Sequence, residues 1–200
     1  MLDPETSAKL VALTTALEKA GVPYAVGGAV VLIYCSEPRG TVDLDINIFL
    51  DSDTPDAALQ AIGRAGVEFD YAKASAQVRR DAQVRLPYLG TPVDLFFVNT
   101  EFHAESGRRA RRVEFEGVEI SLLSCEDLVV YKAMFNRRKD WTDIESLLFM
   151  QASRFDAAYA RGWLVAMVGE EDERMKEFDI ILAEALAAEA EDGGIAPSDE

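Results

Sequence analysis

The sequence predicts an α/β (α+β) fold, in which a small mixed β-sheet is flanked by helices and followed by a C-terminal helical extension. Residues 41–50 alternate apolar and polar side chains, the period-two pattern of a strand. Residues 93–98 form a second strand pattern directly behind the turn signal at residues 90–92. From residue 140 onward apolar residues recur at helical spacing, which predicts the extension.

The other elements follow from the same two periodicities and from turn residues. A first helix, residues 5–19, ends before Gly21-Val22-Pro23. A strand is expected at 24–26. Residues 67–69 and 82–89 are candidate strands, separated by a basic loop. Helices are expected at 29–35, 57–65, 101–110, 140–150, 154–168 and 170–188, with one more starting at Ser124 and a hairpin turning at Glu116-Gly117.

Three regions are expected along the chain. Residues 1–122 carry the strand patterns and should form the core domain. Residues 123–190 should form a helical region packed on that core. Residues 191–200 combine glycines, a proline and acids, so we expect a disordered acidic tail.

The charge balance leaves the partner of the protein open. The 200 residues carry a formal charge of −16, and the pI is near 4.4. Such a surface repels nucleic acid unless a local basic face offsets it. Arginines do cluster between residues 108 and 112, so an RNA partner and a cationic partner both remain compatible with the charge.

The cysteines and the apolar runs indicate the cellular environment of the protein. Cys35 and Cys125 are far apart, without CxxC spacing or a nearby histidine cluster, so neither a disulfide framework nor a zinc site is predicted. The acidic start does not resemble a signal peptide, and the apolar run 24–35 is too short to span a bilayer. We therefore expect a soluble, cytoplasmic protein with no membrane partner.

Three aspartates are the candidate catalytic and metal-binding residues. Asp43 and Asp45 lie two residues apart, so both point to one face of the predicted strand. Asp94 is flanked by apolar residues in another strand, where a carboxylate is costly unless it is paired or binds a metal. Oxygen ligands of this kind suit Mg²⁺. The alternative is that Asp43 and Asp45 are acids of a strand edge that face solvent.

Four further residues are candidates for nucleotide binding. Gly27 and Gly28 stand between a short strand and a helix, where backbone N–H groups can bind a triphosphate, although a glycine pair also suits an ordinary turn. Arg39 precedes the acidic strand and could reach the same phosphates or lie on the surface. Lys132 falls on the apolar stripe of its helix and needs an anion there, either a phosphate or a carboxylate of the protein.

Three other polar residues receive a lower rank. Asp140 suits a helix N-cap with Asp143 at the third helical position, so capping explains both residues and they stay second-tier site candidates. His103, the only histidine, lies between Glu101 and Glu105 and is interpreted as a surface residue rather than a general base.

Two segments of the sequence resemble a known superfamily. The stretch from Val26-Gly27-Gly28, followed by Arg39-Gly-Thr-Val-Asp43-Leu-Asp45, resembles the hG[G/S]…DxD signature of the DNA-polymerase-β-like minimal nucleotidyltransferases. The segment with Lys132, Asp140 and Asp143 is similar to the AbiEii-type abortive-infection toxin branch and its small relatives. Together these segments cover roughly residues 21–150. The resemblance departs at Gly28, because many relatives carry a serine there.

The resemblance implies an activity and its cofactor. The core at residues 1–122 would be the nucleotidyltransferase domain, with Asp43, Asp45 and Asp94 at a site for two Mg²⁺ ions. A nucleoside monophosphate would pass from an NTP to an acceptor hydroxyl, and pyrophosphate would leave. Asp94 would hold the attacking side or act as the base.

The acceptor separates the remaining hypotheses. The resemblance favours a toxin that modifies RNA or protein and is paired with a cognate antitoxin, which we rank first. An adenylyltransferase acting on a small cationic molecule such as an aminoglycoside suits the acidic charge. A non-catalytic nucleotide- or partner-binding module is the third hypothesis, but loss of an acid would be expected for it and all three acids are present.

Overall fold

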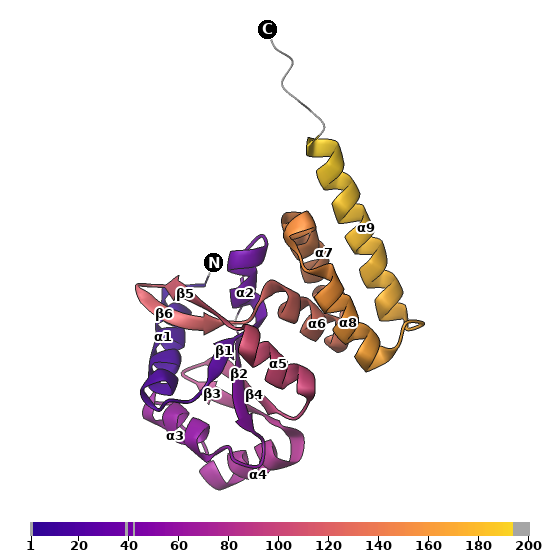
Figure 1. Ribbon diagram of the computed structural model, residues 1–200. Coiled ribbons are helices and arrows are strands. Elements are labelled where there is room, and N and C mark those ends of the chain that lie inside the picture. The colour runs from indigo at the N-terminus through magenta and orange to yellow at the C-terminus, as the bar shows by residue number, and fades with distance from the viewer. Residues whose placement is uncertain (1, 39, 42, 194–200) are drawn as a thin grey trace. The chain divides into compact units, whose positions relative to one another are not determined.

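The computed structural model describes residues 2–38, 40–41 and 43–193. It consists of two compact units (Figure 1). The first comprises Met1–Val31 and Arg39–Ser124, and the second comprises Leu32–Pro38 and Cys125–Glu200. The chain therefore leaves the first unit within helix α2, returns to it, and leaves it again after Ser124.

All described strands belong to one mixed sheet in the first unit. Its strand order is β3-β4-β2-β1-β6-β5. The pairs β2–β4 and β1–β6 are parallel and the others are antiparallel. The strands are β1 (Tyr24–Val26), β2 (Leu44–Asp51), β3 (Gln83–Tyr88), β4 (Thr91–Val98), β5 (Arg111–Phe115) and β6 (Val118–Leu122). This mixed sheet confirms the predicted fold class.

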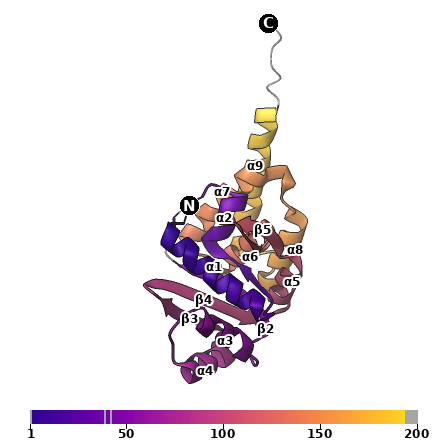
Figure 2. The ribbon, with the colours of Figure 1, turned by 90° about the vertical axis from the view of Figure 1, so that its left-hand side faces the viewer.

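Five helices accompany the sheet: α1 (Pro4–Lys19), α2 (Gly28–Cys35), α3 (Asp56–Arg64), α4 (Tyr71–Asp81) and α5 (Glu101–Arg109). Figure 2 shows α3 and α4 side by side, and α4 packs against β3. The alternation along β2 places Leu44, Ile46 and Ile48 on one face, where all three are fully buried. The side chains between them point to the other face, so the polar residues of β2 share that face.

Two sequence predictions for this unit were wrong. Residues 67–69 form no strand, and α4 occupies the segment expected to be a basic loop. Asp70 caps α4 by accepting a hydrogen bond from the Lys73 backbone N–H at 3.0 Å. The buried side of α4 consists of the small residues Ala74, Ser75 and Val78, so its apolar stripe is weak in the sequence.

The second unit is helical. Its helices are α6 (Cys125–Phe135), α7 (Arg138–Gln151), the short 3₁₀ helix η1 (Ala152–Arg154), α8 (Ala157–Val168) and α9 (Glu173–Gly193). Helix α9 packs against α7 and α8, and buries Met175 and Phe178 completely. Three residues of the expected tail, 191–193, continue α9, while residues 194–200 lie outside the described residues. The region boundaries at 122 and 190 stay predictions.

A disulfide in the second unit corrects the cysteine prediction. Cys35 at the end of α2 and Cys125 at the start of α6 are bonded, with their Cα atoms 5.9 Å apart. The 90 residues between them hide this proximity in the sequence. Among the described residues, no helix is both long and apolar enough to cross a membrane.

Candidate active site

A row of charged side chains crosses three neighbouring strands of the first unit. Asp45 on β2 is paired in register with Asp94 on β4, and Asp94 is paired with Arg85 on β3. Residues directly opposite each other on adjacent strands point to the same face. The two acids that the sequence places far apart therefore lie side by side, with an arginine next to them.

Arg85 binds two of the three predicted acids. Its Nε donates to Asp94 Oδ1 at 2.8 Å and its Nη2 to Asp94 Oδ2 at 2.5 Å, a bidentate pair. The same Nη2 lies 3.5 Å from Asp43 Oδ2. The hydrogen bonds to Asp94 raise the pKa of Arg85 most, and the charges of Asp94, Asp43 and Asp45 raise it further. All three carboxylates thus act on one guanidinium.

Asp43 lies in the loop before β2 rather than in the strand, which begins at Leu44. The Asp43 backbone N–H donates to the Thr41 hydroxyl at 3.3 Å, and that hydroxyl donates to the Asp43 carbonyl at 3.2 Å. Its side chain is one-third exposed and that of Asp94 16% exposed. Both carboxylates are therefore accessible to small ligands.

The glycine pair adjoins Asp45. The Gly27 N–H donates to the Asp45 carbonyl at 2.9 Å. Gly28 has φ +58°, and a Cβ added there would lie 1.9 Å from Asp45 Oδ2. A side chain at this position would both collide with the carboxylate and strain the backbone. This explains the departure from serine: at position 28 this chain has room for glycine only. The carboxylate of Asp45 lies at the start of α2, whose N-terminus favours anions.

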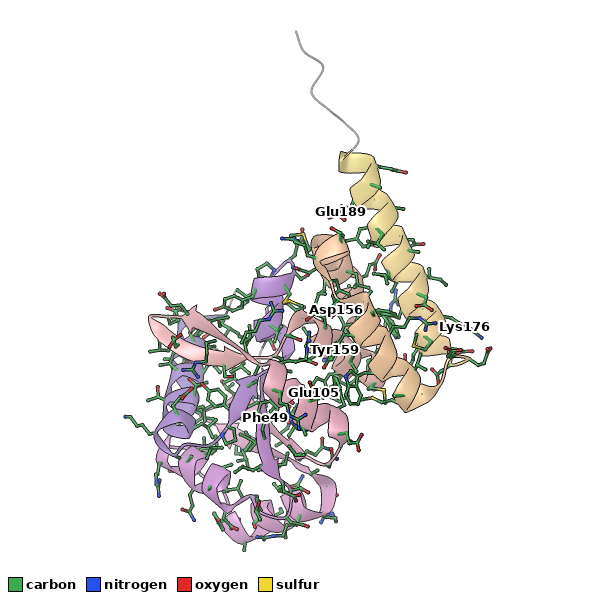
Figure 3. All side chains as sticks on the ribbon, viewed as in Figure 1. Phe49, Glu105, Asp156, Tyr159, Lys176 and Glu189 are labelled. Carbon is green, nitrogen blue, oxygen red and sulfur yellow. A yellow bond between two sulfur atoms is a disulfide. The ribbon has the colours of Figure 1, made fainter. Side chains whose placement is uncertain are left out.

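Helix α5 borders the same face of the sheet. His103 packs edge-on against Phe49 of β2, with ring centroids 5.5 Å apart. Figure 3 labels Phe49. A Cβ at Gly107 would lie 2.7 Å from the Phe49 ring, so α5 approaches β2 closely. His103 is only 4% exposed, which corrects its interpretation as a surface residue. Burial lowers its pKa to about 4, so it is neutral at pH 7.

The chemistry of the donor set suits a hard divalent cation, but its present arrangement is set by Arg85. Three carboxylates surround one positive group, and carboxylate oxygens are the ligands that Mg²⁺ prefers. Within the described parts of the chain, no group of three or more His, Cys, Asp or Glu side chains is close enough together to form a metal site. The acids are arranged around the guanidinium of Arg85, so holding a metal would require this group to give up oxygens of Asp94.

Lys132 belongs to the second unit and has its anions there. Its Nζ donates to Asp143 Oδ2 at 2.5 Å and lies 3.6 Å from Asp140 Oδ1. Asp140 also accepts the Arg137 backbone N–H at 3.2 Å, so it caps α7 from the third helical position instead of the N-cap. The anion that the sequence argument demanded for Lys132 is thus supplied by carboxylates of the protein. Its role in nucleotide binding stays a prediction.

Two other points complete the comparison with the sequence. Arg39 lies outside the described residues, so its expected contact with phosphate stays a prediction. Arg85 was missed, although the β3–β4 turn at Leu89-Gly90 contains the signal for it. A two-residue turn at this place pairs Tyr88 with Thr91, and counting back along both strands puts Arg85 opposite Asp94.

The fold is shared with solved nucleotidyltransferases. The antibiotic-resistance factor ANT(2'')-Ia, solved in solution, has a TM-score of 0.50 at 12% identity over 96% of each chain. A "putative nucleotidyltransferase from H. pylori" has a TM-score of 0.50 at 15% identity, over 92% of this chain and 94% of its own. A comparison with curated protein sequences gives no match.

The family follows from the sequence match. Residues 6–178 match the family described as "Nucleotidyl transferase of unknown function (DUF2204)". This match covers most of the 200 residues, so the chain belongs to that family and is a nucleotidyltransferase. The match does not single out the toxin branch.

Proposed function

We propose that this nucleotidyltransferase transfers a nucleoside monophosphate from an NTP to a hydroxyl of a small cationic acceptor, with Mg²⁺ held by Asp43, Asp45 and Asp94. The observation that carries this proposal is the row of acids across β2 and β4, next to the glycine pair at the start of α2. Bound Mg²⁺ would offset the charge of the triphosphate and favour ionisation of the acceptor hydroxyl.

The residues of the chain have distinct proposed roles. Asp43, Asp45 and Asp94 would each offer carboxylate oxygens to the metal, and Asp94 would in addition accept the proton of the acceptor hydroxyl or orient it. The N–H of Gly28 would contact phosphate oxygens at the start of α2. Gly27, whose N–H is bound to the Asp45 carbonyl, would keep the backbone close to the nucleotide. Arg39 and Lys132 remain proposed contributors to nucleotide binding.

Charge supports a cationic acceptor over RNA. The arginines between residues 108 and 112 are partly neutralised within the first unit, because Arg108 pairs with Glu105 and Arg112 with Glu18. With a net charge of −16, little basic surface remains for a polyanion. The RNA-modifying toxin and its antitoxin partner form the second candidate, which the resemblance of the segment from Lys132 to Asp143 favours.

The test is transfer of label from each α-³²P-labelled NTP in Mg²⁺ buffer to aminoglycosides, tRNA or a cell lysate. We expect labelled small molecules, and loss of at least about a thousandfold in rate for Asp45→Asn, because a metal ligand and its charge are removed. Asp53→Asn, an exposed acid in the turn after β2, is the matched control and should keep full activity. Labelled tRNA would select the second candidate, and an active Asp45→Asn variant would refute the site.

A further inference from the structure

Arg85 has a position that sheet formation does not require. It lies on β3, which is an edge strand of the sheet, and its side chain is 60% exposed. The neighbours Val84 and Leu86 point to the opposite face and are buried. The packing of β3 therefore depends on these apolar residues, whereas the guanidinium of Arg85 lies over the acidic face.

The contacts of Arg85 occupy the acid that the reaction needs. Both oxygens of Asp94 accept from the guanidinium, at 2.8 and 2.5 Å. Asp43 lies 3.5 Å from the same group, and the charge of Asp45 also acts on it. The guanidinium is thus a positive group that contacts two of the predicted metal ligands and is influenced by the charge of the third.

The formal charges give this arrangement a consequence. Three carboxylates with one guanidinium carry a formal charge of −2, which one divalent cation neutralises. A divalent cation at the same acids is repelled by the guanidinium, and the repulsion between such charges a few ångströms apart is substantial even in water. Arg85 and a divalent cation therefore compete for the oxygens of Asp94.

We propose that Arg85 is a positioning residue that holds Asp94 beside Asp45 until a divalent cation displaces its guanidinium. This inference rests on the proposed function, because it assumes that the same acids bind a metal. Arg85 weakens metal binding by its charge and orients Asp94 by its two parallel hydrogen bonds. A lysine at this position would keep the positive charge but could not form the two parallel hydrogen bonds of the planar guanidinium. The two effects can therefore be separated by substitution.

The test is the dissociation constant of Mn²⁺, measured by electron paramagnetic resonance and calorimetry on the full chain without nucleotide. Arg85→Gln should bind Mn²⁺ about tenfold more tightly, since the repulsive charge is gone. Arg85→Lys should stay within about threefold of the unsubstituted protein. Arg80→Gln is the matched control, because Arg80 forms an exposed ion pair with Asp81 on α4. The Mn²⁺ affinity of this variant should equal that of the unsubstituted protein.

The outcomes separate this inference from the proposed function. Equal or weaker Mn²⁺ binding by Arg85→Gln, in a protein that still melts cooperatively by circular dichroism, overturns the role of Arg85 alone. If neither form binds Mn²⁺, the proposed metal site and this inference both fail. If Arg85→Lys binds Mn²⁺ as tightly as Arg85→Gln, and both bind it more tightly than the unsubstituted protein, the positive charge does not oppose the metal. That result would overturn the role proposed for the charge of Arg85 and assign the effect to its two parallel hydrogen bonds.

Discussion

In each unit of the molecule a basic residue lies beside two aspartates, and the two groups differ in their exposure. Arg85 in the first unit is 60% exposed, and its partners Asp94 and Asp43 are 16% and 33% exposed. Lys132 in the second unit is 7% exposed, and Asp140 and Asp143 are 1% and 5% exposed. Water can replace the partners of Arg85 but not those of Lys132.

This difference in exposure distinguishes ion pairs that can exchange a partner for a ligand from ion pairs that serve packing. An ion pair in contact with water contributes about 0–1 kcal/mol, so its members can exchange one partner for a ligand at small cost. Removing one member of a buried pair costs about 3–5 kcal/mol, because a charge is left without compensation. By this criterion Asp43 and Asp94 can exchange their partner at small cost, whereas the buried ion pairs of Lys132 between α6 and α7 cannot.

The largest effect is expected from a substitution that removes Lys132 from its buried ion pairs. Lys132→Ala should lower the free energy of unfolding by about 3–5 kcal/mol, because Asp143 stays buried without its ammonium partner. The double variant Lys132→Met with Asp143→Leu should recover most of that loss, since no unpaired charge remains at Asp143. Urea unfolding measures both variants.

The same double variant decides whether Lys132 binds nucleotide. If it binds NTP as tightly as the unsubstituted protein, Lys132 is a structural residue only. If it is stable but has lost NTP affinity, the comparison between the two groups breaks, and the sequence prediction for Lys132 stands.

The next effect concerns a titratable group of the first unit that is buried. The pKa of His103 is lowered to about 4 by burial, from an unfolded value near 6.5, so between these values the unfolded chain binds more protons. The stabilisation is complete above pH 6.5, declines as the pH falls, and levels off below about pH 4. We expect a loss of about 2 kcal/mol between pH 7 and pH 5.

His103→Leu provides the control for this pH dependence. The unfolding free energy is measured in urea at pH 7 and pH 5. The loss between these pH values should be about 2 kcal/mol smaller in His103→Leu than in the unsubstituted protein, because the titrating ring is gone. Parallel pH profiles for the two proteins would assign the acid sensitivity to other groups.

A smaller effect is expected at Gly28. Gly28→Ala should cost about 1–2 kcal/mol of stability, because an alanine at φ +58° is strained. The added Cβ would also displace Asp45 Oδ2, so transfer activity should fall more than stability does. Gly21→Ala has the same sign of φ but open space around its Cβ, and it should lose stability without losing activity. Equal activity losses in both variants would remove the glycine pair from the site.

The smallest effect is expected from a substitution in an exposed ion pair outside the candidate site. Arg112 pairs with Glu18 on the surface of the first unit, and both side chains are more than 40% exposed. Arg112→Gln should change the unfolding free energy by less than about 1 kcal/mol and leave Mn²⁺ binding unchanged. A large loss of stability would show that exposure does not predict the strength of ion pairs in this protein.

Sequence and structure agree on the positions of two candidate acids, Asp45 and Asp94, because both lie in strands with a clear local pattern. The alternation along residues 41–50 placed Asp45 correctly on the polar face of β2, and the register then set Asp94 beside it. The fold class and most elements followed from the same periodicities. Helix α4 was missed because its buried side uses small residues, so propensity and hydrophobic pattern gave no clear signal.

What the sequence did not predict depends on contacts between distant segments. The disulfide joins residues 90 positions apart, and no spacing rule identifies such a pair. The partner of Lys132 was left open between phosphate and carboxylate, and only the packing of α6 against α7 supplies Asp143 and Asp140. Arg85 is a different case, because the two-residue turn at Leu89-Gly90 sets the register that pairs it with Asp94, and a one-residue shift would have turned it to the other face.

The bond between Cys35 and Cys125 makes the chain a covalent ring with two tails. The ring runs from residue 35 to residue 125 and contains β2 through β6, and with them Asp43, Asp45, Arg85 and Asp94. A single proteolytic cut inside the ring would open it but release no fragment until a reductant is added. A nicked molecule would therefore keep its acids and its glycine pair in one covalent species, and electrophoresis with and without reductant would reveal it.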